Sequence, residues 1–212
     1  MVSMEKFRFY AFKLTGVLIL VFILQMLIPG FTEFFLLDSS KLLEVWRFLT
    51  SIFLHAGVTH ILYNGFALLL FGSILERLIG ERKFLIVFFS TGVLANIVSV
   101  WFYPSSLGAS GAIFGVIGAL IVVRPLMTVW AFGLPMPIFV AGILWVAGDV
   151  LGAVGFLVGN PINNTGNIAH LSGIFIGFIF GFFYRKRKER GRENTLRFAE
   201  GSVRNWEDSW MR

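Results

Sequence analysis

The chain has 212 residues, of which 57% are hydrophobic and 14% are charged, with a formal net charge of +6. A soluble domain carries about a quarter charged residues, so this chain has too few charges to cover a surface that faces water, and its composition indicates a membrane protein. The absence of cysteine excludes disulfides, thiol nucleophiles and thiolate metal ligands.

Six hydrophobic segments are long enough, or nearly long enough, to cross a membrane as helices. Crossing the hydrocarbon core takes about 20 apolar residues in helical form. The first segment has the charge pattern of a signal peptide, but it ends in Leu27-Ile28-Pro29-Gly30 without a small-x-small cleavage site, so we expect a retained helix. The predicted helices are Phe9–Ile28, Val58–Leu78, Phe84–Phe102, Ser110–Val123, Pro137–Val158 and Gly166–Tyr184.

The connection between the first two predicted helices is long and apolar. It has roughly 29 residues and is rich in Phe, Leu and Trp, whereas connections in helix bundles usually have about two to eight residues. We therefore expect a structured element that folds partly into the membrane interface. Trp46 and Arg47 are interpreted as residues that stabilise it.

The fourth predicted helix is unusually short. Gly108 lies before it and Arg124-Pro125 follows it, which leaves about 14 residues and a length of about 21 Å at 1.5 Å per residue. The hydrocarbon core of a bilayer is about 30 Å thick. If Arg124 lies at one membrane surface, Ser110 begins its helix below the other, so a partly submerged helix is expected.

The basic residues indicate the orientation of the helices, because cytoplasmic loops carry an excess of Lys and Arg. Segments 103–109 and 159–167 carry no charge and are assigned to the outer side. Both termini and the connections between helices 2 and 3 and between helices 4 and 5 are then cytoplasmic. The residues on which this assignment depends are Lys6, Arg8, Lys13, Arg77, Arg82, Lys83, Arg124 and Arg185-Lys186-Arg187-Lys188.

The positive charge is concentrated at the C-terminus. Nine of the 18 basic residues follow Tyr184, against five acidic residues there. A basic tail beside a hydrophobic segment is typical of a topology signal or of contact with anionic lipid headgroups, so no nucleic-acid partner is expected. We predict a transmembrane domain over residues 1–184 and a basic cytoplasmic tail over residues 185–212.

Polar residues converge near the outer ends of three predicted helices. His55 and His60 lie at the start of the second helix, His170 at the start of the sixth, and Ser110 at the start of the fourth. Asn64 is one turn below His60 on the same helix face. A lone histidine in a membrane is more often a satisfied polar group, but ionisable residues there are costly and usually mark a site. The convergence of these residues with a serine favours a catalytic site.

Glycines four residues apart occur on the fourth and sixth predicted helices. Small residues at this spacing allow two helix backbones to approach closely in a membrane. Such a contact would bring the Ser110 hydroxyl within hydrogen-bond reach of the His170 ring, and a serine nucleophile needs an adjacent base at neutral pH. The glycines are Gly111 and Gly115 on the fourth helix and Gly173, Gly177 and Gly181 on the sixth.

A serine nucleophile that transfers an acyl group also needs donors for an oxyanion. The start of the fourth helix offers unpaired backbone N–H groups, including that of Ser110, and a favourable helix dipole. His60 and the amide of Asn64 can add donors from the second helix. Asn64 can alternatively make a structural hydrogen bond between helices, and the sequence leaves both interpretations open.

Five motifs occur in order along the predicted helices: Trp46-Arg47, His55…His60-x-x-x-Asn64, Glu76-Arg77, Gly108-Ala109-Ser110-Gly111 and Ala169-His170-x-x-Gly173-x-x-x-Gly177. Across about residues 40–185 this set resembles the rhomboid family of intramembrane serine proteases. The resemblance implies an all-α bundle of six transmembrane helices. It also implies a Ser110–His170 dyad and an oxyanion pocket made by His60, Asn64 and the Ser110 backbone N–H.

The resemblance also implies a substrate class, and the distribution of basic residues implies an orientation in the membrane. The expected substrates are single-pass membrane proteins, which are cut in the bilayer within or beside their spanning segment, without a metal or other cofactor. The expected location is the cell membrane, with the active site open to the extracytoplasmic side. The residues expected to support the site are His55, Phe114, Trp46, Arg47, Gly108 and Gly173.

Two details concern the neighbours of the imidazole. Phe114 lies one turn after Ser110, where relatives often have a tyrosine that packs on the catalytic histidine, and a phenylalanine ring should keep this stacking. The family pattern has no third, acidic member, and we expect none here at the required spacing. Asp149, the one acid inside the fifth predicted span, is expected either to pair with a polar group near the cavity or substrate entrance or to make a buried helix–helix hydrogen bond.

Two polar motifs away from the site have structural interpretations. Glu76 and Arg77 are interpreted as an ion pair at the inner end of the second helix. Asn163-Asn164-Thr165 fits a glycosylation sequon in an outer loop.

Two other functional classes fit a protein with several membrane spans. A catalytically silent rhomboid-like protein would bind membrane clients without cutting them, but it would typically lack the serine or the histidine. A transporter or channel would need a polar path through the whole bilayer, whereas the polar residues here cluster in the outer half. No internal repeat is evident, which weakens an inverted-repeat transporter.

Overall fold

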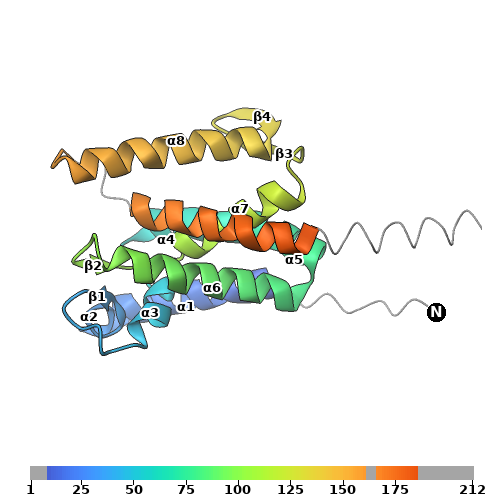
Figure 1. Cartoon of the computed structure of the whole chain (residues 1–212). Helices are drawn as coiled ribbons and strands as arrows, with labels where there is room; N and C mark the ends of the chain where they lie inside the picture. Colours follow the sequence, from blue (N-terminus) through green and yellow to red (C-terminus); the bar gives the residue numbers. More distant parts are fainter. Residues whose placement is uncertain (1–8, 161–165, 186–212) are drawn as a thin grey trace, which may run out of the picture.

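The computed structural model describes residues 9–160 and 166–185 as a bundle of helices (Figure 1). Each of the six predicted segments corresponds to a helix. The predicted sequon at residues 163–165 and the tail beyond Arg185 lie outside the described residues. In the described ranges five helices are long and apolar enough to span a membrane: Tyr10–Leu27 (α1), Val58–Ile79, Glu81–Ser99 (α6), Ile138–Leu157 (α8) and Asn167–Arg185, called the last helix below.

The second of these helices is continuous but not uniform. It consists of α4 (Val58–Ala67), a π-helical turn η2 (Leu68–Gly72) and α5 (Ser73–Ile79). Gly80 follows with a φ of +87°, a backbone conformation that favours glycine. This break lets α6 begin at Glu81, three residues before the predicted start.

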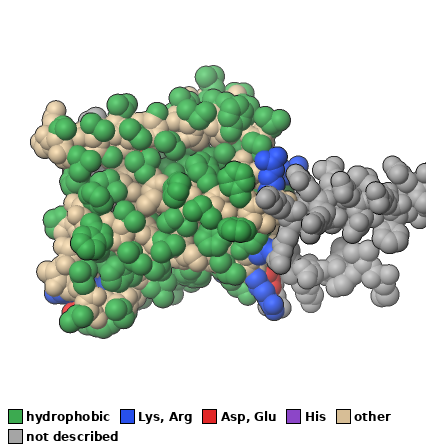
Figure 2. Space-filling view, in the orientation of Figure 1, with side chains coloured by type: hydrophobic (Ala, Val, Ile, Leu, Met, Phe, Trp, Pro, Cys, Tyr) green, Lys and Arg blue, Asp and Glu red, His purple; other side chains and the backbone are tan. Residues whose placement is uncertain are grey.

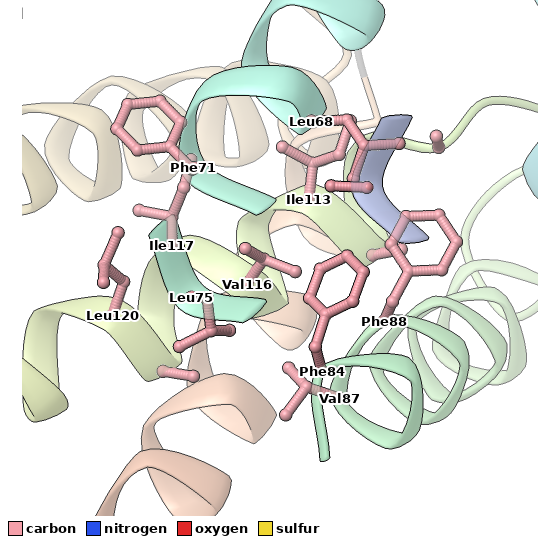
Figure 3. Close-up of a cluster of buried hydrophobic side chains, with 14 of the residues drawn as sticks. Leu68, Phe71, Leu75, Phe84, Val87, Phe88, Ile113, Val116, Ile117 and Leu120 are labelled. Carbon is pink, nitrogen blue, oxygen red and sulfur yellow. The ribbon is translucent and has the colours of Figure 1, made fainter. Parts of the chain in front are cut away.

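The short predicted helix is α7, Ser110–Val123, with 14 residues. It lies in the middle of the bundle, and all but four of its residues are buried, as expected for a helix that is apolar on every side. Figure 3 shows the cluster of side chains around it, which come from η2, α5, α6 and α7. The labelled members are Leu68, Phe71, Leu75, Phe84, Val87, Phe88, Ile113, Val116, Ile117 and Leu120.

The long first connection is structured, as predicted. It contains two short helices, α2 (Phe31–Phe35) and α3 (Arg47–Thr50), a short strand β1 (Leu37–Asp38) and a 3-10 turn η1 (Ser51–Phe53). The labelled elements α2, β1 and α3 lie at the end of the bundle opposite α5 (Figure 1).

Arg47 holds this connection together from inside. Its side chain is buried, and one terminal nitrogen, Nη1, donates hydrogen bonds to the carbonyl of Glu33 at 2.8 Å and to that of Leu36 at 2.7 Å. Trp46 stacks on Phe34 with ring centroids 6.3 Å apart. Both residues therefore stabilise the first connection, as expected.

The first connection is joined to the segment that leads into α7. Strand β1 pairs in antiparallel fashion with β2 (Ser105–Ser106), so that Leu37 lies opposite Ser106. The backbone N–H of Gly108 donates to the carbonyl of Ser51 at 2.9 Å. These bonds fix the chain immediately before Ser110.

A β-hairpin between α7 and α8 was not predicted. It pairs β3 (Thr128–Ala131) with β4 (Leu134–Pro137) through a turn at Phe132 and Gly133. Both turn residues have positive φ, 53° and 79°, as in the two-residue turns that match the twist of a hairpin. The two prolines in β4 obscured the strand in the sequence, because proline is confined to edge strands.

Glu76 has a longer-range partner than its neighbour in the sequence. Its buried carboxylate accepts hydrogen bonds from the backbone N–H groups of Tyr10, at 2.9 Å, and Ala11, at 3.0 Å. These are the first N–H groups of α1, which have no partner within their own helix. Glu76 therefore caps α1, a role that the interpretation as an ion pair did not include.

Charge and apolar surface are separated along the bundle. Figure 2 shows apolar side chains over most of the visible lateral surface, while most of the visible Lys and Arg side chains gather at the end where α5 lies and the last helix ends. At this end the Nζ of Lys83 lies 5.4 Å from the centre of the Tyr184 ring. A bundle with an apolar flank and a basic end suits a bilayer.

The contact between α6 and α7 gives a test of packing. A Cβ at Gly115 would overlap the side chain of Thr91, whereas a Cβ at Gly148 on α8 would meet no atom within 4 Å. We expect Gly115→Ala to lower the free energy of unfolding by about 1–3 kcal/mol. Gly148→Ala should leave it unchanged or raise it slightly, since alanine favours helices. Denaturant unfolding in detergent measures both, and equal stabilities would contradict this packing.

Candidate active site

Ser110 is the first residue of α7. The preceding residue, Ala109, is buried and provides no side-chain hydrogen bond to the start of the helix. The first N–H groups of a helix have no partners within it, and they carry the positive end of the helix dipole. The backbone at Ser110 thus offers donors beside a hydroxyl.

The ring of His60 packs directly on the backbone that precedes Ser110. Gly108 has a φ of +122°, and a Cβ there would lie 2.7 Å from Cε1 and 2.9 Å from Nε2 of His60. Any side chain at this position would displace the ring. Gly108 is therefore needed both for its backbone conformation and for the approach of His60 from α4.

The predicted contact between α7 and the last helix is confirmed. A Cβ at Gly173 would overlap the carbonyl oxygen of Gly111, and a Cβ at Gly177 would overlap that of Gly115. One turn further, a Cβ at Gly118 would overlap the carbonyl of Ile174. The two backbones are thus in direct contact over two turns, as glycines four residues apart allow.

This contact between the two helices places His170 beside α7. The rings of His170 and Phe114 are stacked, with centroids 4.3 Å apart and planes 5° from parallel, so the expected stacking is present. Phe114 lies four residues after Ser110 and shares its helix face. Within residues 9–160 and 166–185 the Ser110 hydroxyl makes no hydrogen bond to the His170 ring, so the dyad itself stays a prediction.

One edge of the His170 ring meets an acid. Nδ1 of His170 lies 3.1 Å from Oδ1 of Asp149 on α8. Both side chains are largely buried, with exposed fractions of 12% and 10%. Two alternatives were expected for Asp149: pairing with a polar group near the cavity, or a buried hydrogen bond between helices. The contact with the His170 imidazole fulfils both.

The polar groups of α4 are tied to the backbone around them. Nδ1 of His60 accepts the N–H of Ala56 at 3.3 Å, so the hydrogen of a neutral ring lies on Nε2. The side-chain nitrogen of Asn64 donates to the His60 carbonyl at 3.0 Å. This bond runs within α4, so it does not support the interhelical alternative for Asn64.

His55 packs against His60. The residue is 2% exposed, and its ring meets the His60 ring edge-on with centroids 5.0 Å apart, while its backbone N–H donates to Gln25 Oε1 at 2.9 Å. Burial, and then the proximity of His60, lowers the pKa of His55 to about 4. His55 is therefore a neutral packing group near pH 7.

The described residues hold no cluster of three or more His, Asp or Glu side chains that could bind a metal ion.

The matching family model is the Rhomboid domain, over residues 42–187. The chain belongs to the rhomboid family. It is an intramembrane serine protease of that family, and its relatives include proteins named rhomboid protease.

Three relatives show how far this rhomboid's similarity extends. The Bacillus subtilis protein YdcA is 34% identical over 150 residues, which are 69% of this chain and 71% of that one. Rhomboid protease GlpG of Haemophilus influenzae is 32% identical over 154 residues, 71% of this chain and 75% of that one. Rhomboid protease GluP of Bacillus subtilis is 46% identical over 81 residues, 38% of this chain and 16% of that one.

The acid beside the imidazole corrects one expectation for this rhomboid. The prediction that no acid lies at the required spacing was wrong, because Asp149 reaches His170 from another helix, 21 residues earlier in the chain. No local spacing could show this contact. The available signal was a single acid within an otherwise apolar span, which is costly unless it has a partner.

The lowered pKa of His55 predicts a pH dependence of stability. An unfolded histidine has a pKa of about 6.5, so between about pH 6.5 and pH 4 the unfolded rhomboid binds a proton that folded His55 does not. The free energy of unfolding should therefore fall as the pH falls through this window. Above about pH 6.5, where His55 is neutral in both states, its titration no longer changes the stability. In His55→Gln this part of the slope should vanish in unfolding curves recorded from pH 4 to 7. The same slope in both proteins would contradict the assignment.

Proposed function

We propose that this rhomboid cuts single-pass membrane proteins within or beside their spanning segment, with Ser110 as nucleophile and His170 as base. The observation that carries the proposal is the stacking of His170 on Phe114, one turn from Ser110 on the same face of α7. The glycine contact between α7 and the last helix supports it, because it leaves no side chain between the two backbones.

The reaction has two steps through an acyl-enzyme. Nε2 of His170 takes the proton of the Ser110 hydroxyl, and the oxygen attacks the carbonyl carbon of the substrate peptide bond. The carbon–nitrogen bond then breaks, and His170 gives the proton to the leaving amine. A water molecule, deprotonated by the same imidazole, releases the acyl group and restores Ser110.

The oxyanion of each step needs donors aimed at the place where charge develops. In the proposed pocket these are the backbone N–H of Ser110, Nε2–H of His60 and the amide of Asn64. The acceptor role of His60 Nδ1 leaves Nε2 as the donor, next to the backbone that precedes Ser110. The Asn64 amide has two hydrogens, and its bond to the His60 carbonyl uses one of them.

The proposed membrane arrangement has six spans in a domain over residues 1–184, with a cytoplasmic tail over residues 185–212. The protein lies in the cell membrane with both termini on the cytoplasmic side, since the basic end of the bundle is expected on that side. The 14 residues of α7 then span about 21 Å. Ser110 would therefore lie below the outer surface, in a pocket open to extracytoplasmic water.

Ser110→Ala should abolish reaction with a serine-directed fluorophosphonate and cleavage of a single-span substrate in detergent. The matched control is Ser105→Ala, which removes an exposed hydroxyl from β2 at the same end of the bundle. The control should be labelled like the original protein. Labelling that persists in Ser110→Ala would exclude Ser110 as the nucleophile.

Asn64→Ala tests the oxyanion pocket. Loss of one oxyanion donor lowers kcat by about a hundred- to a thousandfold in a soluble serine protease, and we expect a fall of about one to three powers of ten here. Steady-state cleavage rates of the folded variant measure it. An unchanged kcat would remove Asn64 from the pocket and leave it a structural residue of α4.

A further inference from the structure

We propose that Asp149 is a positioning residue for His170, so that the site works as a serine–histidine–aspartate arrangement rather than as a dyad. The carboxylate would keep the hydrogen of the neutral imidazole on Nδ1 and stabilise the imidazolium that forms during the reaction. This inference rests on the proposed function, and it starts from the 3.1 Å contact between Asp149 Oδ1 and His170 Nδ1.

The position of the carboxylate is set by helix packing. Gly152, one turn after Asp149 on α8, packs so closely on Asn167 that a Cβ there would overlap the Asn167 side chain. Asn167 lies one turn before His170 on the last helix. Two successive turns of α8 therefore face two successive turns of the last helix, and the Asp149–His170 pair is the inner of the two contacts.

A third element closes the outer end of this contact. Tyr103, in the segment after α6, packs on the ring of Phe156 of α8 with centroids 4.9 Å apart. Its hydroxyl accepts the backbone N–H of Ile168 from the last helix at 3.2 Å. Tyr103 thus bridges the two helices that carry Asp149 and His170, which holds their registers together.

The burial of Asp149 argues against a purely adhesive role. It is the one charged residue of α8, and its side chain is only 10% exposed. A charged side chain inside a membrane span is costly, and the contact between these helices is already supplied by glycine packing. A neutral side chain would make an adhesive hydrogen bond at lower cost, whereas a carboxylate adds the ability to stabilise a positive imidazole.

The chemistry of the imidazole gives such a partner a role. A neutral histidine exists in two tautomers, and only the one with its hydrogen on Nδ1 has a lone pair on Nε2 that can accept the Ser110 proton. An acceptor at Nδ1 selects that tautomer. The proton then moves from Ser110 to Nε2 and on to the leaving nitrogen, while the aspartate stays ionised and stabilises the transient charge.

The groups that contact the ring come from two other helices. Asp149 lies on α8 and Phe114 lies on α7. In the described part of the chain, Asp149 is the acid that contacts the ring. Its charge is therefore the one to remove in a test.

The kinetic test is Asp149→Asn in the full-length protein. Asparagine keeps the size and an acceptor oxygen but removes the charge. We expect kcat to fall by about tenfold to ten-thousandfold, the upper value being that of the same change in a soluble triad, while KM stays the same because the contact acts on the transition state. An unchanged kcat, or a loss confined to KM, would overturn the proposal.

The spectroscopic test follows the tautomer directly. The chain has three histidines, so ring 15N signals in detergent micelles are few, and those missing in His170→Gln identify His170. We expect the Nδ1–H tautomer in the original protein and a shift toward the Nε2–H tautomer in Asp149→Leu. A predominant Nε2–H tautomer in the original protein would overturn the proposal without any variant at Asp149.

A matched control separates positioning from stability. Asn96→Leu removes the two hydrogen bonds that another buried side chain donates, to the Phe48 carbonyl at 2.8 Å and to the Ser51 hydroxyl at 2.9 Å, neither of which involves the His170 ring. It should lower the unfolding temperature and leave the His170 tautomer unchanged. If Asn96→Leu shifts the tautomer as much as Asp149→Leu does, the effect is one of general destabilisation and the positioning role is wrong.

Failure of the Asp149 proposal can be distinguished from failure of the proposed function. If Ser110→Ala abolishes labelling while Asp149→Asn leaves kcat and the tautomer unchanged, the dyad stands and the role of Asp149 falls. If Ser110→Ala is still labelled, the nucleophile is wrong. The tautomer experiment then still decides whether Asp149 orients the imidazole.

Discussion

The direct backbone contact between α7 and the last helix is the constraint on which the site depends. Gly173 and Gly177 lie against the carbonyls of Gly111 and Gly115, where even a methyl group would overlap the opposite backbone. In a membrane, lipid is as apolar as most side chains, so helices associate through close packing rather than through the hydrophobic effect. The contact therefore provides both cohesion and the short distance that chemistry between two helices requires.

Close packing also organises the end of the bundle at which α7 begins. Gly108 brings the chain before α7 between the Ser51 carbonyl and the His60 ring. Arg47 holds the first connection by donating to backbone carbonyls that would otherwise lack partners. Unsatisfied backbone groups are costly in a membrane, so irregular segments survive there when buried side chains satisfy them.

Helix α8 has a different relation to the bundle. It approaches α7 at Gly142, against Ile121, and the last helix at Gly152, against Asn167, so glycine determines both places of contact. Between them it presents Asp149 to the imidazole. The arrangement combines two general requirements: a buried acid needs a partner, and a base that takes a proton from serine needs a defined tautomer.

Patterns in the sequence predicted the helices and indicated the candidate residues of the site. Hydropathy located all six segments, glycine spacing identified the α7 contact, and the order of the polar motifs indicated Ser110 and His170. These signals are local, because helical period and backbone size act over a few residues. The acid beside His170, the cap that Glu76 provides for α1, and the β-hairpin before α8 were decided by tertiary structure. Each depends on how distant segments align in rotation and depth, and that alignment is set by packing over the whole bundle.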